Sequence, residues 1–290
     1  MPPPHPVRRA PPASVIVLVL GLALVAGSTL LLLLSGQTDM RYSADHGDTV
    51  PMWTRWVPAL AGIALVWLLP RPPETGGAPA GRPPLAEALV LTGLALLFAV
   101  ALYALDGGEP AHTLLKLTLL LAAPLLLLQW LRRSGGAWRE AVRPGPVRHG
   151  WAPAVPVLGW AALTYAGPFA MPPSDYGRTV DALTLAVTIV VVFLVNALLE
   201  EVFYRRWLQT RWEAVLGAWP AIVLSSLLWA CWHVAIQGRG DLPLDLATAF
   251  VNQGVMGLFL GYLWSWCRLM WPLLVVHGLA NSGSILLGLL

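Results

Sequence analysis

The sequence carries little charge for its length. Asp, Glu, Lys and Arg make up 11% of its 290 residues, about half the quarter that is usual in soluble domains. Lys116 is the only lysine, and most of the arginines lie in short loops. So little charge leaves no soluble domain of useful size, and the scattered arginines do not form the clustered basic surface of a nucleic-acid-binding protein. We therefore predict no nucleic-acid partner.

Cysteine is scarce as well. Cys231 and Cys267 lie in or beside apolar stretches, and no metal-binding or redox motif has their spacing. Free cysteine is among the most buried residue types, so we interpret both as buried structural thiols.

Long apolar stretches dominate the chain instead. Hydrophobic residues make up 57% of the sequence, and many of its 15 tryptophans stand where an apolar stretch meets a loop. Stretches of about 20 apolar residues predict transmembrane helices, and tryptophan is enriched at both membrane interfaces. The prediction is an all-α polytopic membrane bundle of about eight to nine helices. The predicted spans are residues 14–34, 56–69, 85–105, 113–131, 151–170, 183 onward, 218–236, 246–264 and 271–289.

The loops between these stretches indicate an orientation. The proline-rich residues 1–13 predict a disordered tail, and the loop at 132–150 carries five arginines. Cytoplasmic loops are enriched in Lys and Arg, so we expect a cell-membrane protein whose N-terminal tail and 132–150 loop are cytoplasmic. This loop divides the chain into a four-span region of unknown role, residues 14–150, and a five-span region, residues 151–290.

Two adjacent carboxylates, Glu200 and Glu201, interrupt the sixth apolar stretch. A carboxylate at the centre of a membrane helix costs roughly 2.5–3.5 kcal/mol, so such residues are usually functional. If the helix continues to a turn near residues 214–217, Glu200 lies about 22 Å above that turn and His233 about 26 Å above it, at similar depth. A continuous helix also brings Arg205 within reach of Glu201 as an i,i+4 pair, which leaves Glu200 free to react.

Two of the six histidines, His233 and His277, lie inside apolar stretches. Asn281 follows His277 by four residues, so both point to one face of a helix and can donate two hydrogen bonds to a developing oxyanion. The alternative is packing between helices, in which histidines and amides simply make interhelical hydrogen bonds. Spacing alone leaves both interpretations open.

Three motifs in order resemble those of the CPBP intramembrane proteases, a group that includes CaaX prenyl endoproteases and bacterial Abi-type relatives. They are E-E-x-x-x-R from Glu200 to Arg205, an aromatic residue four positions before His233, and H-x-x-x-N from His277 to Asn281. The resemblance covers roughly residues 180–290. Trp229 is a departure, because the family usually has phenylalanine there. The first four spans resemble nothing that we can name.

The resemblance implies an intramembrane endopeptidase that cleaves a membrane-anchored or lipid-modified protein near its C-terminus. Glu200, helped by His233, would activate a water molecule, His277 and Asn281 would hold the oxyanion, and Glu201 with Arg205 would support the site. We prefer a reaction without a cofactor; a zinc ion held by Glu200, His233 and His277 is the alternative. Candidates for the cavity lining are Asn196, Trp229 and Asn252.

A non-enzymatic transporter or sensor, with the Glu200, Glu201 and Arg205 cluster as a buried relay, is the competing class. The amide of Asn281 argues against it, because a proton path needs titratable groups.

Overall fold

The computed structural model describes residues 12–42, 47–70, 84–133 and 151–290. The predicted disordered tail at 1–13 falls almost entirely outside these residues, as does nearly all of the basic loop at 132–150 that separates the two predicted regions.

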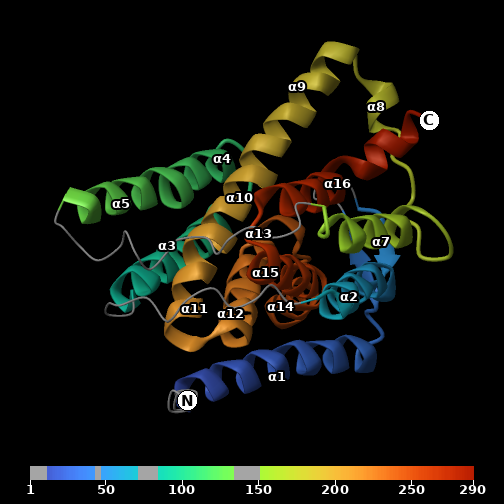
Figure 1. The fold of residues 1–290 in the computed structure, drawn as a ribbon. Coiled ribbons are helices and arrows are strands. Elements are labelled where there is room, and N and C mark those ends of the chain that lie inside the picture. The colour runs from blue at the N-terminus through green and yellow to red at the C-terminus, as the bar shows by residue number, and fades with distance from the viewer. Residues whose placement is uncertain (1–11, 43–46, 71–83, 134–150) are drawn as a thin grey trace.

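Among the described residues, seven helical stretches are long and apolar enough to cross a membrane, and two apolar helices are shorter. Figure 1 shows a bundle of helices with one small two-stranded ribbon. The first half contains α1 (Pro12–Leu34), β1 (Asp39–Arg41), β2 (Thr49–Pro51), α2 (Met52–Leu68), α3 (Leu85–Ala104), α4 (Ala111–Leu115), η1 (Lys116–Ala122) and α5 (Ala123–Arg133). The second half begins with α7 (Ala154–Tyr165) and α8 (Tyr176–Thr179).

The two shorter helices, α2 and α7, occupy the second and fifth predicted spans. With 12 residues, α7 is roughly 18 Å long, which is less than the hydrocarbon thickness of about 30 Å. The predicted fifth span, 151–170, is therefore too long. Its helix ends before Gly167, whose φ of 83° is not helical, and before Pro168, which disfavours a helical conformation in the residue ahead of it.

A single long helix runs from Ala182 to Leu216. It consists of α9 (Ala182–Val192), η2 (Phe193–Leu198), α10 (Leu199–Glu201), η3 (Val202–Gln209) and α11 (Thr210–Leu216), where η marks the wider π form. Asp181 caps its first turn by accepting hydrogen bonds from the backbone N–H groups of Leu183 and Thr184. Gly217, at φ 87°, ends it in a conformation that favours glycine. The prediction that the helix continues past the glutamates and turns near residue 217 is confirmed.

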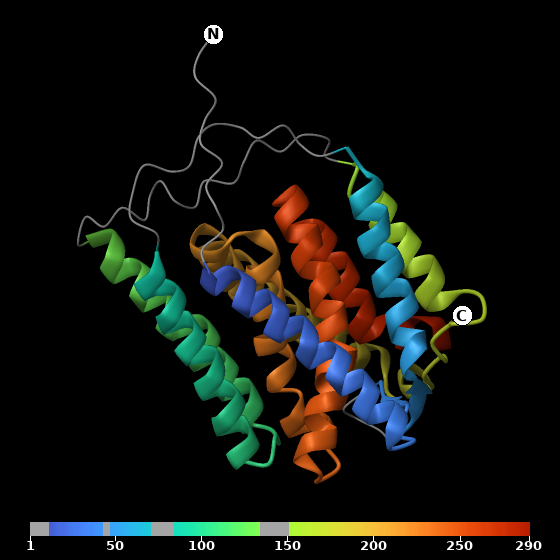
Figure 2. The same cartoon turned by 90° about the horizontal axis from the view of Figure 1, so that it is seen from below.

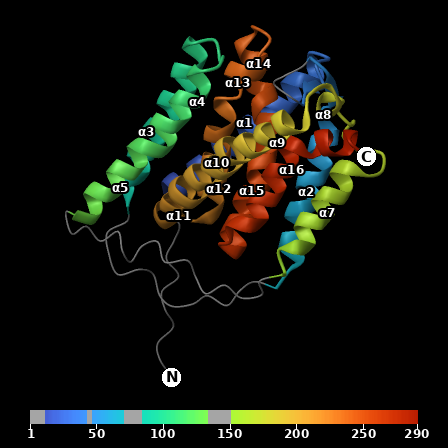
Figure 3. The ribbon, with the colours of Figure 1, turned by 90° about the horizontal axis from the view of Figure 1, so that it is seen from above.

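The remaining helices are α12 (Ala218–Cys231), α13 (Val234–Gln237), α14 (Leu242–Ala249), η4 (Phe250–Gly254), α15 (Val255–Cys267) and α16 (Met270–Gly288). Helix α12 lies at the centre, in contact with α1, α15 and the η3 part of the long helix. Figures 2 and 3 show the α3 to α5 hairpin along one side of the bundle and the α2–α7 pair along the other. Buried apolar side chains of α12 and α15 form much of the core, whereas α1 exposes most of its side chains, as a lipid-facing helix does.

Candidate active site

Glu200 lies in α10, the short α-helical turn between the two π segments of the long helix. Its side chain is 1% exposed. Oε1 accepts a hydrogen bond from Lys116 Nζ at 2.6 Å, and Oε2 accepts one from the indole Nε1 of Trp229 at 2.6 Å. A cation and a neutral donor thus hold the two oxygens of this carboxylate in one orientation.

Lys116 is the residue that sequence reasoning missed. It begins η1, is completely buried, and also donates to Asn196 Oδ1 at 2.7 Å. Its ammonium lies 4.5 Å from the centre of the Trp232 ring, within the range of a cation–π contact. The signal was present in the sequence, because the only lysine of the chain stands inside an apolar stretch, and intramembrane charges are usually paired with one another.

Glu201 makes two contacts of its own. Oε2 lies 3.2 Å from Arg205 Nε, the i,i+4 pair that the sequence predicts. The N–H groups of Arg205 are not directed along hydrogen bonds to any described residue, so this contact is an ion pair without hydrogen-bond geometry. The guanidinium also lies 5.0 Å from the centre of the Trp229 ring. The second contact joins Glu201 Oε1 to His277 Nδ1 at 2.8 Å.

His277 stands between the two glutamates. An ionised carboxylate can only accept hydrogen bonds, so with Glu201 ionised His277 Nδ1 is the donor in this contact. Nε2 lies 3.9 Å from Glu200 Oε2, which is too far for a direct hydrogen bond. When the ring is neutral, Nε2 then carries the lone pair and is the ring atom that can accept a proton.

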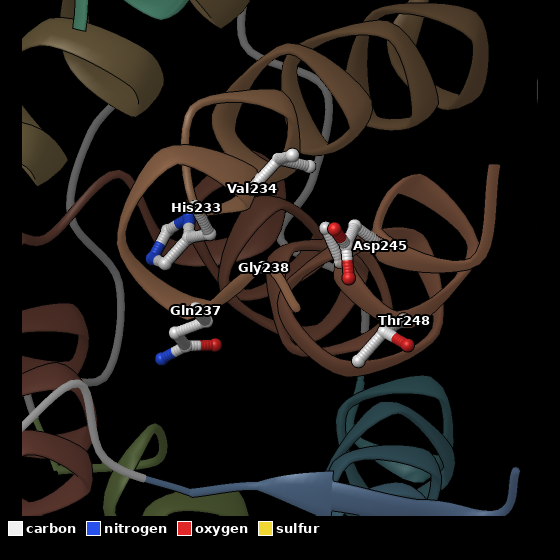
Figure 4. Close-up of a pocket in the computed structure, with 7 residues that line it drawn as sticks. His233, Val234, Gln237, Gly238, Asp245 and Thr248 are labelled. Atoms are coloured by element: carbon white, nitrogen blue, oxygen red, sulfur yellow. The ribbon is translucent and has the colours of Figure 1, made fainter. Parts of the chain in front are cut away.

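His233 lines a cavity formed by residues of α13 and α14 and the loop between them. Its Nδ1 is 3.1 Å from the backbone carbonyl oxygen of Trp229, and its ring stacks on Trp232 at 3.7 Å. Figure 4 shows the side chains around this cavity, which is small and partly open. The lining residues are His233, Val234, Gln237, Gly238, Asp245, Thr248 and Ala249. The ring of Trp229 is 5.1 Å from that of His233 and 5.4 Å from that of His277, so it lies close to both imidazoles.

The structure brings most of the predicted site residues together. Glu200, Glu201, Arg205, His277 and Trp229 form one buried cluster, with Asn196 attached through Lys116. Asn281 and Asn252 lie apart from this cluster.

The side chain of Asn281 is exposed and makes no hydrogen bond within the described part of the chain. Asn252 lines a second cavity together with Arg55. His277 bonds Glu201, and the joint action of His277 and Asn281 on one oxyanion stays a prediction.

Among the described residues, no three His, Cys, Asp or Glu side chains are grouped as a metal site requires. The oxygens of Glu200 already accept hydrogen bonds from Lys116 and Trp229, so a zinc ion there would have to displace one of these donors.

Residues 182–283 match a protein family described as type II CAAX prenyl endopeptidase Rce1-like. No curated protein and no solved structure matches the chain. The matched segment begins with the long helix and includes His233, His277 and Asn281, so it contains the whole cluster except Lys116. The chain therefore carries, over residues 182–283, an Rce1-like domain of the type II CAAX prenyl endopeptidases, a family of multi-pass membrane proteases.

Proposed function

We propose that this protease cleaves a membrane-anchored or lipid-modified protein near its C-terminus, with a water molecule activated at Glu200 and His277. The observation that carries the proposal is the buried cluster around Glu200 and Glu201. Each carboxylate has one cationic partner and one further donor, Trp229 or His277, so the site is both charge-balanced and rigid. Such preorganised polar groups act strongly in a site that excludes water.

The 3.9 Å between Glu200 Oε2 and His277 Nε2 suits one water molecule that bonds both atoms. In the proposed reaction, Glu200 orients this water and His277 Nε2 accepts its proton as the oxygen attacks the scissile carbonyl carbon. The ionised Glu201 then stabilises the imidazolium through Nδ1, as a carboxylate does for the histidine of a catalytic triad. His233 supports this step from the adjacent cavity.

The attack converts the carbonyl oxygen into an oxyanion and leaves a tetrahedral carbon. We propose that the exposed amide of Asn281, one turn beyond His277 on α16, donates to this oxyanion when substrate is bound. Protonated His277 then transfers its Nε2 proton to the leaving nitrogen, the C–N bond breaks, and the neutral imidazole is restored. The proton balance closes without a metal or a cofactor.

In the first half of the chain, α3 and η1 contact the long helix. Lys116 reaches Glu200 and Asn196, Glu87 pairs with Arg211 at 2.7 Å, and Thr92 accepts from the indole N–H of Trp212 at 2.9 Å. We propose that this region, in a cell-membrane protein with a cytoplasmic N-terminus, serves as a support for the catalytic helix.

A comparison of cells with and without the protein tests the function. We expect C-terminally shortened membrane proteins to appear only in cells that contain it. Glu200→Gln, His233→Ala and His277→Ala should each abolish the shortening while the protein still accumulates in the membrane. Normal shortening by Glu200→Gln would contradict the proposed mechanism.

A further inference from the structure

A second, small and partly open cavity lies beside the catalytic helices, between α2, α7, α16 and the η4–α15 segment. Most of the side chains that line this cavity are polar or aromatic: Thr54, Arg55, Trp160, Thr164 and Asn252. Met256 and Ala280 complete the lining. Arg55 is the single charged residue among them.

Arg55 differs from the other interior cations of the described chain in having no carboxylate partner. Lys116, Arg205 and Arg211 each pair with a glutamate. Arg55 Nε instead donates to Asn252 Oδ1 at 3.0 Å, and Nη1 contacts the sulfur of Met171 at 3.8 Å. A guanidinium has five N–H donors in a fork that matches a carboxylate. Most of these donors remain for an anion from outside the chain.

Asn252 fixes the position of this guanidinium. Its side-chain oxygen accepts from Arg55, and its Nδ2 lies 3.5 Å from the backbone carbonyl oxygen of Arg41, next to the β-ribbon turn. Asn252 is 2% exposed, so its amide holds the arginine side chain from behind rather than competing for the ligand.

The cavity is close to the catalytic residues along two helices. Ala280 follows His277 by three residues on α16, a rise of about 4.5 Å. Thr248 lines the His233 cavity, whereas Asn252 and Met256 line the Arg55 cavity. Thr248, Asn252 and Met256 follow one another at intervals of four residues, so they lie along one face of the α14–η4–α15 helix over roughly 12 Å. An extended peptide rises about 3.3 Å per residue, so roughly three to four residues cover that length.

We propose that Arg55 binds the terminal carboxylate of the substrate, and that Asn252 is the positioning residue that holds its guanidinium. The inference rests on the proposed function and adds to it a subsite outside the matched family segment, on α2. It explains why a cation faces a cavity near His277 without a counter-ion: the counter-ion arrives with the substrate.

Two prenylated peptides that differ only at the end of the chain test the subsite. One ends in a free carboxylate and the other in a carboxamide, and both are assayed with the full-length protein in vesicles of neutral phosphatidylcholine. We expect wild type to prefer the acid in kcat/KM by about 10- to 100-fold, as for a hydrogen bond to a charged group. Arg55→Gln should reduce this preference to about one. Arg206→Gln, which removes an exposed arginine elsewhere, should keep it.

The ratio of kcat/KM between the acid and the carboxamide peptide separates recognition of the carboxylate from damage to the fold. A merely structural role for Arg55 would lower cleavage of both peptides equally and leave the preference intact, which would overturn the inference. Addition of anionic phosphatidylglycerol tests a lipid phosphate as the ligand. If Arg55→Gln changes activity only in those vesicles, and equally for both peptides, the carboxylate assignment is wrong.

Failure of the proposed function has a different signature. If wild type cleaves neither peptide, the proposed function fails for prenylated substrates. Binding of both peptides to Glu200→Gln then decides the subsite, because equal affinities for acid and amide would overturn it and tighter binding of the acid would support it.

Discussion

Replacement of Lys116 by methionine should destabilise the protein and abolish its activity. The ammonium and the Glu200 carboxylate are 2.6 Å apart, and both are almost completely buried. At an effective dielectric constant of about 20 their attraction is roughly 6 kcal/mol. The transfer of two ions from water costs several kcal/mol each, so the intact pair contributes little net stability. Removal of one partner leaves a buried uncompensated charge, which costs about 3–5 kcal/mol.

A double-mutant cycle isolates the coupling energy between Lys116 and Glu200. The free energy of unfolding is measured in the same detergent for wild type, Lys116→Met, Glu200→Gln and the double variant. We expect the double variant to recover most of the loss of Lys116→Met, with a coupling energy of about 2–3 kcal/mol, because neither charge remains. Activity is compared per folded molecule, and Lys116→Arg should retain part of it.

The second ion pair between the two halves of the chain is the matched control. Glu87→Gln removes the partner of Arg211, which lies in the same long helix as Glu200 but away from the catalytic cluster. It should lower stability with little change in kcat. Additive effects of Lys116→Met and Glu200→Gln, or full activity of Lys116→Met, would refute the assigned role of the lysine.

Three further predictions concern the chemistry. Glu201→Gln removes the charge that orients His277 and should lower kcat by about 10²–10⁴-fold relative to wild type, with the helix content of the variant unchanged. A small effect on kcat would exclude the Glu201–His277 pair from catalysis. Asn281→Ala should lower kcat by about 10²–10³-fold at constant KM, since its amide is expected to act on the oxyanion alone; an effect confined to KM would make it a binding residue. Exhaustive chelation should leave the cleavage rate unchanged, and a loss that zinc restores would establish the metal-dependent alternative.

The long helix and its glutamates could be predicted from the sequence because the relevant signals are local. The pairing of Glu201 with Arg205 follows from helical spacing, and the end at Gly217 follows from a residue that adopts positive φ without strain. The depth comparison between Glu200 and His233 also needed only helix geometry. The two π segments that flank α10 have no comparable local signature, and they were not foreseen.

The contacts of Lys116 and His277 could not be predicted in the same way. Lys116 lies 84 positions before Glu200 and His277 lies 76 after Glu201, and no spacing rule relates residues on separate helices. The partner of His277 decides which ring nitrogen carries the proton. Spacing alone places Asn281 on the same helix face as His277, whereas packing of α16 against the long helix supplies Glu201 as the hydrogen-bond partner.

The charge balance of the cluster shows why the first half of the chain matters. Glu200 and Glu201 carry two negative charges in a membrane helix, and within the matched segment, residues 182–283, Arg205 neutralises one of them. Lys116, from outside that segment, neutralises the other. With both histidines neutral, the cluster has no net charge, which is the condition under which buried carboxylates are tolerated. The charge balance of the buried glutamates in the matched domain therefore depends on a residue that the domain does not contain.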